Sequence, residues 1–268
     1  MEAVSGSLIM TMDLTDSGVM RLTMGDILRR NALSLLMLDS LSTELKDAAD
    51  NPDIRVIILA ATGPAFSAGH DLKEITAARA TADKGQAFFQ GLMKSCSTLM
   101  QLIVTHPKPV IAEVNGVATA AGCQLVASCD LAYASETSRF ATPGVNIGLF
   151  CSTPMVALSR NTARKHAMEM VLSGEMIPAS RAAEIGLINR AVPEHSLSAV
   201  VNQMAETIAS KPGQTLKIGK RAFYEQAEMG LAQAYTHTSK VMVENLLAAD
   251  AKEGISAFLE KRDPKWES

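Results

Sequence analysis

The hydrophobic pattern near the N-terminus predicts a strand, a helix and a second strand. Residues 18–24, GVMRLTM, alternate between apolar and polar side chains, whereas residues 54–61, IRVIILAA, form a continuous β-branched run. Such a run is typical of a strand that is covered on both faces. Between the two segments, Leu38, Leu41 and Leu45 share one face of a helix. A strand, helix and strand in this order favour a parallel connection, and therefore an α/β protein.

A second helix and a third strand are predicted in the next part of the chain. The helix covers residues 86–104 and ends before Pro107 and Pro109, because proline lacks a backbone donor and clashes with the preceding turn. The apolar stretch PVIAEVNG, residues 109–116, then predicts a strand. Residues 76–85 are rich in Ala and Thr with little apolar pattern, so we expect a mobile surface segment there.

From residue 153 onward the pattern becomes mostly helical. Residues 180–192, SRAAEIGLINRAV, predict a helix with Gly186 as its C-terminal cap, followed by a short strand. Further helices are predicted over residues 197–210, 214–229, 232–249 and 251–261. No strand pattern remains after about residue 208. We therefore expect an α/β core, residues 1–208, and a helical region, residues 209–268.

The composition is that of a globular protein and excludes two classes of partner. The 268 residues are 47% hydrophobic and 20% charged, with a formal net charge of −3. No basic field is available to attract nucleic acid or an anionic membrane surface. The longest apolar stretch, residues 109–134, contains Glu113, Asn115, Gln124 and Asp130. We interpret it as a buried strand, loop and helix, and expect no membrane span.

The cysteines and histidines show no metal-binding spacing. The four cysteines include no CxxC pair, and the five histidines are scattered along the chain. We therefore expect neither a metal nor a redox cofactor. The chain also shows no signal-peptide pattern, which together with the cysteine usage favours a reducing compartment. The expected location is the cytoplasm, with the mitochondrial matrix as the alternative, in which case the transit peptide is absent from this chain.

Two loops that follow predicted strands carry the strongest chemical signal. They are FSAGHDL, residues 66–72, and GVATAAGCQL, residues 116–125. Ligands of open α/β sheets bind beyond the carboxyl ends of the strands, where free backbone N–H groups can converge on one oxygen. The alternative is that Ala and Gly only permit close packing. Phosphate-binding GxGxxG and GxxxxGK[ST] motifs and the GxSxG nucleophile motif are absent.

Three stretches make a family resemblance specific. They are GPAFSAGHDLKEI at 63–75, PVIAEVNGVATAAGCQLVASCDLAYASETSRFATPGVNIGLF at 109–150 and EIGLINRAVP at 184–193. In this order and spacing the chain resembles the enoyl-CoA hydratase/isomerase (crotonase) family from about residue 12 to the C-terminus. The resemblance implies a crotonase-type superhelix of ββα turns with two roughly perpendicular sheets and a C-terminal helical trimerisation region. It also implies an acyl-CoA ligand, and a homotrimer or a dimer of trimers.

The resemblance assigns roles to particular groups. The backbone N–H groups of His70 and Ala121 match the family's oxyanion hole, in which two donors hold the thioester oxygen. Coenzyme A belongs to the substrate, and no separate cofactor is required. Its expected contacts are Arg30, Ala32, Ala68, His70, Asp71, Leu72 and Gly122. In this family the C-terminal helix of a neighbouring subunit covers the adenine, which points to Phe258 and Lys261.

Two positions depart from the family's catalytic pattern. Hydratases of this family use two glutamates, because water addition needs one group to take a proton and another to deliver one. These positions correspond to Gln124 and Gly144, so one has become an amide that cannot ionise and the other has no side chain. Efficient hydration is therefore not expected. Asn146 is a further candidate, able to orient a thioester or a carboxylate.

Three hypotheses about function remain open at this stage. The chain is an enzyme that stabilises a thioester enolate, a non-catalytic acyl-CoA binder, or an assembly partner of active relatives. Decarboxylation is the least demanding reaction for such a site, because it can rely mainly on the oxyanion hole. Among nearby side chains only the His70 imidazole has a suitable unperturbed pKa. Cys151 has no identifiable base beside it.

Overall fold

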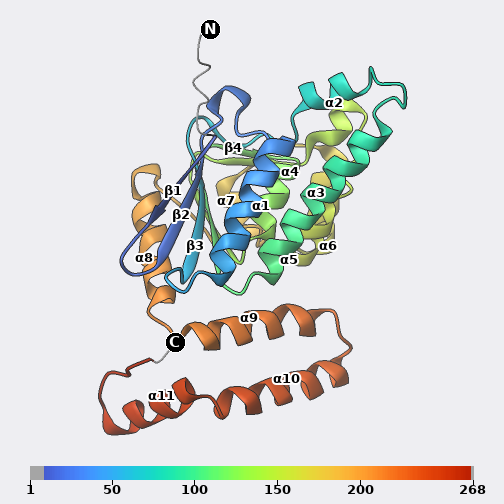
Figure 1. Ribbon diagram of the computed structural model, residues 1–268. Coiled ribbons are helices and arrows are strands. Elements are labelled where there is room, and N and C mark those ends of the chain that lie inside the picture. The colour runs from blue at the N-terminus through green and yellow to red at the C-terminus, as the bar shows by residue number, and fades with distance from the viewer. Residues whose placement is uncertain (1–8, 267–268) are drawn as a thin grey trace.

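The computed structural model describes residues 9–266, within which the chain forms two β-sheets (Figure 1). The larger sheet has the strand order β1 (Met10–Leu14), β2 (Val19–Met24), β3 (Val56–Ala61), β5 (Val110–Val114), β7 (Leu131–Ser135) and β10 (Arg190–Val192). The smaller sheet has the order β4 (Ala65–Ser67), β6 (Val117–Thr119), β8 (Arg139–Ala141) and β9 (Ile177–Pro178). Of the strand pairs described, β1–β2 and β8–β9 are antiparallel and the others are parallel. The predicted α/β class is confirmed.

Helices cover both faces of the larger sheet. Helices α1 (Leu35–Asp50) and α3 (Gln86–Thr105) lie on one face, and α8 (Leu197–Ala209) lies on the other (Figure 1). In β3, Ile57 and Leu59 belong to the core on the α1 side, whereas Val56 and Ile58 belong to the cluster under α8. Successive side chains of a strand point to opposite faces. Strand β3 must therefore be apolar at every position, which explains its lack of alternation.

The rest of the core contains short helices and turns. They are α2 (Leu72–Ala78), α4 (Ala121–Ser128), α5 (Pro154–Asn161), α6 (Arg164–Ser173) and α7 (Ala179–Glu184), with the 3-10 turns η1 (Ile27–Arg29), η2 (Pro143–Ile147) and η3 (Glu194–Ser196). Every residue of α4 is buried, and the helix packs against α3, α5, β4 and β6. A single residue separates the end of β6 from the start of α4. The first turn of α4 lies next to the end of β4.

The segment 76–85 is more ordered in its hydrogen bonding than its composition indicates. Its first residues form the last turn of α2. The Asp83 carboxylate then accepts hydrogen bonds from the Thr81 hydroxyl at 2.6 Å, from the Gly85 N–H at 3.0 Å and from the Ala87 N–H at 2.8 Å. These bonds, led by the one from Thr81, lower the pKa of Asp83. The predicted surface position is correct, but side-chain capping organises the turn before α3.

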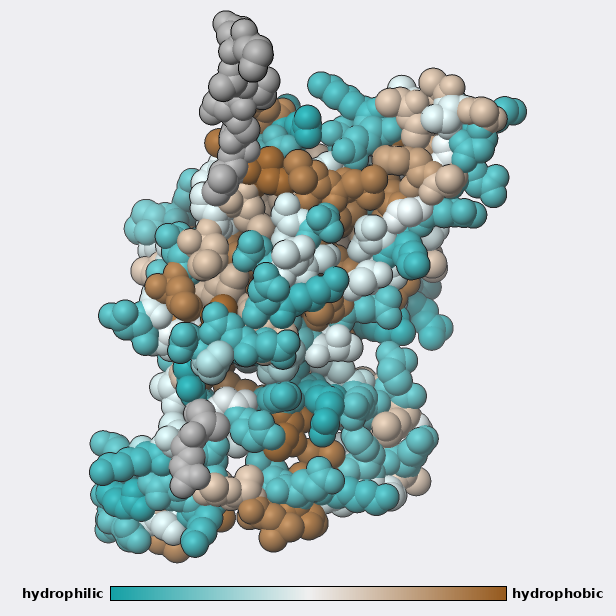
Figure 2. All heavy atoms as spheres, viewed as in Figure 1, coloured by the Kyte–Doolittle hydropathy of each residue, from teal (hydrophilic) through white to brown (hydrophobic). Residues whose placement is uncertain are grey.

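The last three helices form a tail beside the core. They are α9 (Gly213–Ala227), α10 (Leu231–Leu246) and α11 (Ala249–Glu260), and Figure 1 shows them separated from the sheets. Large apolar side chains remain exposed on them, including Leu231 at 78%, Leu247 at 83% and Phe258 at 81%. Figure 2 shows apolar surface along the lower edge of this tail. Extensive exposed apolar surface of this kind is typical of an interaction surface.

A partly buried ion pair attaches the tail to the core. The Lys220 ammonium of α9 lies 2.7 Å from Asp130 Oδ2 and donates to the backbone oxygens of Ile103 and Lys108. The Tyr224 hydroxyl donates to Asp130 Oδ1 at 2.9 Å. Burial lowers the pKa of Lys220, and the Asp130 carboxylate opposes this effect. The attachment therefore depends on each charge keeping its partner.

Replacing Lys220 by methionine is expected to destabilise the protein by about 2–3 kcal/mol, because the partly buried Asp130 carboxylate then loses its cation. The free energy of unfolding can be measured by urea denaturation followed by circular dichroism. The control is Lys217→Met on the same helix, where the lysine is exposed and the expected change is within about 0.5 kcal/mol. Equal losses for the two variants would contradict this role for the ion pair.

The types of most predicted elements agree with the structure. Strands β2 and β3 are parallel and flank α1, and the helices predicted after residue 197 correspond to α8 to α11. Strands β1, β4, β6, β7, β8 and β9 were not indicated as separate strands by the apolar pattern. None of the helices within residues 9–266 is long and apolar enough to cross a membrane.

Candidate functional site

The two loops selected from the sequence lie against each other. Strands β4 and β6 are parallel neighbours, so the segments that follow them leave the same edge of the smaller sheet. A Cβ atom added to Gly69 would lie 2.9 Å from Ala120 Cβ, 3.1 Å from Thr119 O and 3.4 Å from Ala121 N. A Cβ atom added to Gly122 would lie 2.3 Å from Ser67 O. The small residues therefore permit close packing and bring two backbone segments together.

Two backbone N–H groups in these loops have no acceptor among residues 9–266. Ala121 is the first residue of α4, so its N–H has no partner one turn earlier in the helix. His70 lies between β4 and α2, outside regular secondary structure. Within residues 9–266 neither N–H group donates to another protein group. Both N–H groups therefore lack an acceptor among the described residues.

Ala120, the residue before α4, has a strained backbone. Its φ is 50° and its ψ is −119°, a conformation that L-residues rarely adopt. Such strain costs about 1–3 kcal/mol and persists only where the surrounding structure enforces it. Here the Ala120 N–H donates to Ala141 O at 2.9 Å, and Gly69 packs against the Ala120 methyl group. These contacts fix the direction in which α4 begins.

A third segment, residues 30–33, is hydrogen-bonded to the first loop. The Ala68 N–H donates to Arg30 O at 3.0 Å, and the Leu33 N–H donates to Gly69 O at 2.8 Å. The buried Asn31 side chain donates to two backbone oxygens next to β4, those of Thr62 and Ala65. Arg30 and Asn31 both have positive φ, near 50°. The amide of Asn31 was not selected from the sequence, because a lone Asn in a loop carries no specific signal.

The His70 imidazole is oriented by a hydrogen bond to the backbone. Its Nδ1 lies 3.1 Å from Leu33 O, and since a carbonyl can only accept, Nδ1 carries the proton. Burial lowers the pKa of His70, against smaller effects of Leu33 and of Glu74 that raise it. The other ring nitrogen, Nε2, is buried and has no hydrogen-bond partner among the described residues. In a neutral ring protonated at Nδ1 this nitrogen is an acceptor, and none of the described residues donates to it.

The two positions that depart from the family pattern are both buried. Gln124 is 4% exposed, and its Oε1 lies 3.9 Å from Cys96 Sγ. Gly144 lies in η2, where an added Cβ would be only 2.6 Å from Leu149 O and 2.9 Å from Cys151 Sγ. The loop after η2 thus occupies the space that a side chain at residue 144 would need. A carboxylate is absent at both positions, and one of them has no room for it.

The cysteines near the site are poor nucleophiles. Burial raises the pKa of Cys151, with a smaller opposing effect from the Gly144 N–H. Burial also raises the pKa of Cys96 to about 11 and that of Cys123 to about 12. Because the thiolate is the reactive form, burial makes these thiols less nucleophilic. Within residues 9–266 no group of three or more His, Cys, Asp or Glu side chains is arranged to hold a metal ion.

The structure brings most of the expected coenzyme A contacts to the same loops. Arg30 and Ala68 are exposed, Ala32 is buried, and Leu72 is 54% exposed. The Asp71 carboxylate caps α2 by accepting from the Lys73 N–H at 2.8 Å. The remaining members of the set are His70 and Gly122, described above.

Three candidates lie away from these loops or have other contacts. Phe258 lies in α11, and Lys261 is the C-terminal cap of that helix. In Figure 1, α11 and α2 lie at opposite ends of the molecule. The amide nitrogen of Asn146 would lie 3.2 Å from a Cβ atom added to Gly174, so this side chain packs against the end of α6.

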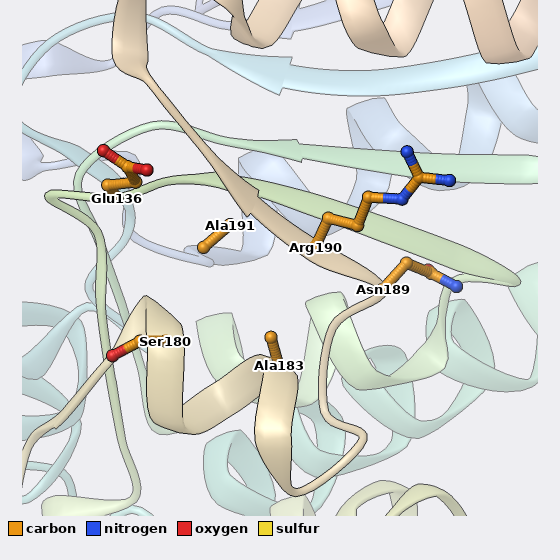
Figure 3. Close-up of a pocket in the computed structure, with 6 residues that line it drawn as sticks. All are labelled: Glu136, Ser180, Ala183, Asn189, Arg190 and Ala191. Carbon is orange, nitrogen blue, oxygen red and sulfur yellow. The ribbon is translucent and has the colours of Figure 1, made fainter.

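A separate hollow contains none of the candidate residues. It has a volume of about 580 Å³ between α7 and β10 and is lined by Glu136, Ser180, Ala183, Asn189, Arg190 and Ala191 (Figure 3). In Figure 3 the Glu136 carboxylate and the Arg190 guanidinium point away from each other. The hollow therefore offers no convergent set of polar groups.

The fold and the paired loops define a known class of protein. The model of the enoyl-CoA hydratase/isomerase family matches residues 15–268. The chain therefore belongs to the enoyl-CoA hydratase/isomerase family, as the motifs predicted.

Within that family, particular relatives are similar over most of the chain. The stretches AAGCQLVASCD and FATPGVNIGLFCSTP resemble the enoyl-CoA hydratase domain-containing protein 3 subgroup. The rat mitochondrial protein of that name is 49% identical over 249 residues, which are 93% of this chain and 81% of the relative. The crystal structure of the human protein superposes with a TM-score of 0.91 at 48% identity, covering 96% of this chain and 100% of that one. An enoyl-CoA hydratase from Mycobacterium smegmatis gives 0.92 at 43% identity, covering 98% and 100%.

Proposed function

We propose that this chain binds an acyl-CoA thioester with the carbonyl oxygen between the N–H groups of His70 and Ala121. The observation that carries the proposal is that both donors lack an acceptor among the described residues and lie on loops in direct contact. The names of the relatives, which refer to enoyl-CoA, support a CoA thioester as the ligand. Coenzyme A lies along the exposed edge formed by Arg30, Ala68 and Leu72.

In the proposed reaction the protein stabilises an enolate. Two preorganised donors aimed at the thioester oxygen are worth most when negative charge develops there, and one such donor contributes about 2.7–4 kcal/mol of barrier. A decarboxylation fits the groups present. The bond between Cα and the carboxylate carbon breaks, CO₂ leaves, the electron pair forms the enolate, and water protonates Cα. The alternative is a non-catalytic binder, which the missing carboxylates at Gln124 and Gly144 favour equally.

Calorimetric titration tests the binding proposal. We expect acetoacetyl-CoA to bind at least about tenfold more tightly than free coenzyme A, a difference of about 1.4 kcal/mol. The reason is that its acidic Cα proton allows the bound thioester to approach an enolate. Equal affinity for the two ligands would contradict an oxyanion hole. Mass spectrometry of a mixture of acyl-CoA thioesters after incubation then separates enzyme from binder, since only an enzyme changes a substrate mass.

The tail supports an assembly of three chains or a dimer of trimers. Its exposed apolar residues, such as Leu231 and Phe258, need a partner surface. In such an assembly Phe258 and Lys261 cover the adenine of a neighbouring subunit's ligand. Light scattering should give three or six times the chain mass of 28.5 kDa, and a monomer would contradict the proposal. An assembly partner would instead form mixed oligomers when combined with an active relative.

We propose that the protein is located in the cytoplasm, with the mitochondrial matrix as the alternative. The mitochondrial names of the vertebrate relatives support the alternative. Immunofluorescence of the native protein distinguishes the two locations in a eukaryotic source.

A further inference from the structure

One side chain joins the two loops at a point where the backbone ladder has ended. Strands β4 and β6 pair irregularly, and Ser67 and Ala118 are their last paired residues. The backbone of the next residue, Thr119, pairs on its other side with Ala141 of β8. Its hydroxyl, however, donates to Ala68 O at 3.1 Å, across 51 positions of sequence. This hydrogen bond connects the two segments one residue beyond the last paired residues of β4 and β6.

The two residues joined by this hydrogen bond are equally far in sequence from the two N–H groups of the proposed oxyanion hole. Thr119 comes two residues before Ala121, and Ala68 comes two residues before His70. Thr119 is 9% exposed, so little water competes for the bond. Between the bond and the donors, Gly69 packs tightly against the backbone that leads into α4. The two donor-bearing segments are thus held together immediately before each donor.

We propose that Thr119 is a positioning residue whose hydroxyl sets the distance between the N–H groups of His70 and Ala121. The proposal rests on the function proposed above. Neither N–H group donates a hydrogen bond to any residue that the structure describes, so the spacing of the two groups depends on the surrounding contacts. A displacement of about 1 Å in such an arrangement can reduce a rate about 100-fold. A single hydroxyl is therefore able to determine how strongly the carbonyl is polarised.

The test measures polarisation of the carbonyl directly. Butyryl-CoA, labelled with ¹³C at the thioester carbon, is bound at saturating concentration, and its C=O stretching frequency is recorded by infrared difference spectroscopy. We expect wild type to lower the frequency relative to free ligand. Thr119→Val should lose at least half of this shift, whereas Thr119→Ser, which keeps the hydroxyl, should retain it. The dissociation constant should rise no more than about tenfold in Thr119→Val, as expected for one hydrogen bond.

A matched control separates loss of a hydroxyl from loss of this particular bond. Thr162 is also buried and donates to a backbone oxygen, that of Leu158 at 3.1 Å, at the end of α5. Thr162→Val is expected to keep the full shift. The spectrum is recorded on the saturated complex and therefore reports only folded protein with bound ligand. A variant whose only defect is a lower free energy of unfolding gives the wild-type C=O frequency.

Each remaining outcome has a defined meaning. If wild type itself produces no shift, the proposed oxyanion hole is wrong and the role of Thr119 is wrong with it. If wild type and Thr119→Val give the same shift, the oxyanion hole stands and the positioning role is overturned. Thr119→Ala provides a smaller replacement in case valine disturbs packing. If both variants fail to fold by circular dichroism while Thr119→Ser folds, the hydroxyl supports the fold and the proposal is again overturned.

Discussion

Replacing Gly122 by alanine is expected to weaken binding of acetoacetyl-CoA by about 100-fold and to destabilise the fold by about 1–3 kcal/mol. The added Cβ would lie 2.3 Å from Ser67 O and 2.8 Å from Ser67 Cβ. The obstacle is backbone of β4, which cannot rotate away, so α4 must move. The Ala121 N–H then moves with the first turn of α4. Calorimetric titration measures the affinity, and urea denaturation measures the stability.

The chain provides a close control for the glycine substitution. Gly219 lies inside α9, and an added Cβ there would have no atom within 4 Å. Gly219→Ala should leave affinity unchanged and stabilise the helix by about 0.5–1 kcal/mol, since glycine is the poorer helix former. Gly122→Ala with wild-type affinity would show that the proposed donor does not touch the ligand, whatever its stability.

The two loops of the candidate site could be selected from the sequence, because they carry dense local signals. In 66–72 and 116–125, small residues directly follow apolar runs. The helix cap formed by Asp71 was not predicted. The contact between the two loops was predicted through the family resemblance and through the rule that ligands of α/β sheets bind beyond the carboxyl ends of the strands. Strands β4 and β6 escaped detection, because three residues are too few to establish an alternation.

The features that determine the precise geometry of the site were not predictable from local patterns. Ala120 and Asn31 adopt positive φ without being glycine, so no residue type marks the turn. The Thr119 hydroxyl finds its acceptor 51 residues away, which depends on the irregular pairing of β4 with β6. At Gly144 the missing carboxylate is evident from the sequence. The filling of its space by Leu149 O depends on how the chain turns after η2.

Wild-type protein is expected to leave crotonyl-CoA unchanged, whereas Gln124→Glu should exchange Cα protons of bound butyryl-CoA with deuterium from D₂O. Hydration needs two proton transfers, and each missing group costs about 10²–10⁴-fold in rate. Exchange at Cα needs only one base. A glutamate at 124 has nearly the shape of the glutamine, and burial raises its pKa towards neutrality, where a base is most effective. We expect an increase of about 100-fold over wild type.

Loss of the conjugated absorbance of crotonyl-CoA measures hydration, and mass spectrometry of the thioester measures exchange. Gln101→Glu adds the same charge on the exposed side of α3 and should give no exchange. Gly144→Glu should also give none, because its Cβ would lie 2.6 Å from Leu149 O and must displace that loop. Rapid hydration by wild type would show that other groups transfer the protons. A Gln124→Glu variant that binds butyryl-CoA without exchange would show that residue 124 does not face Cα.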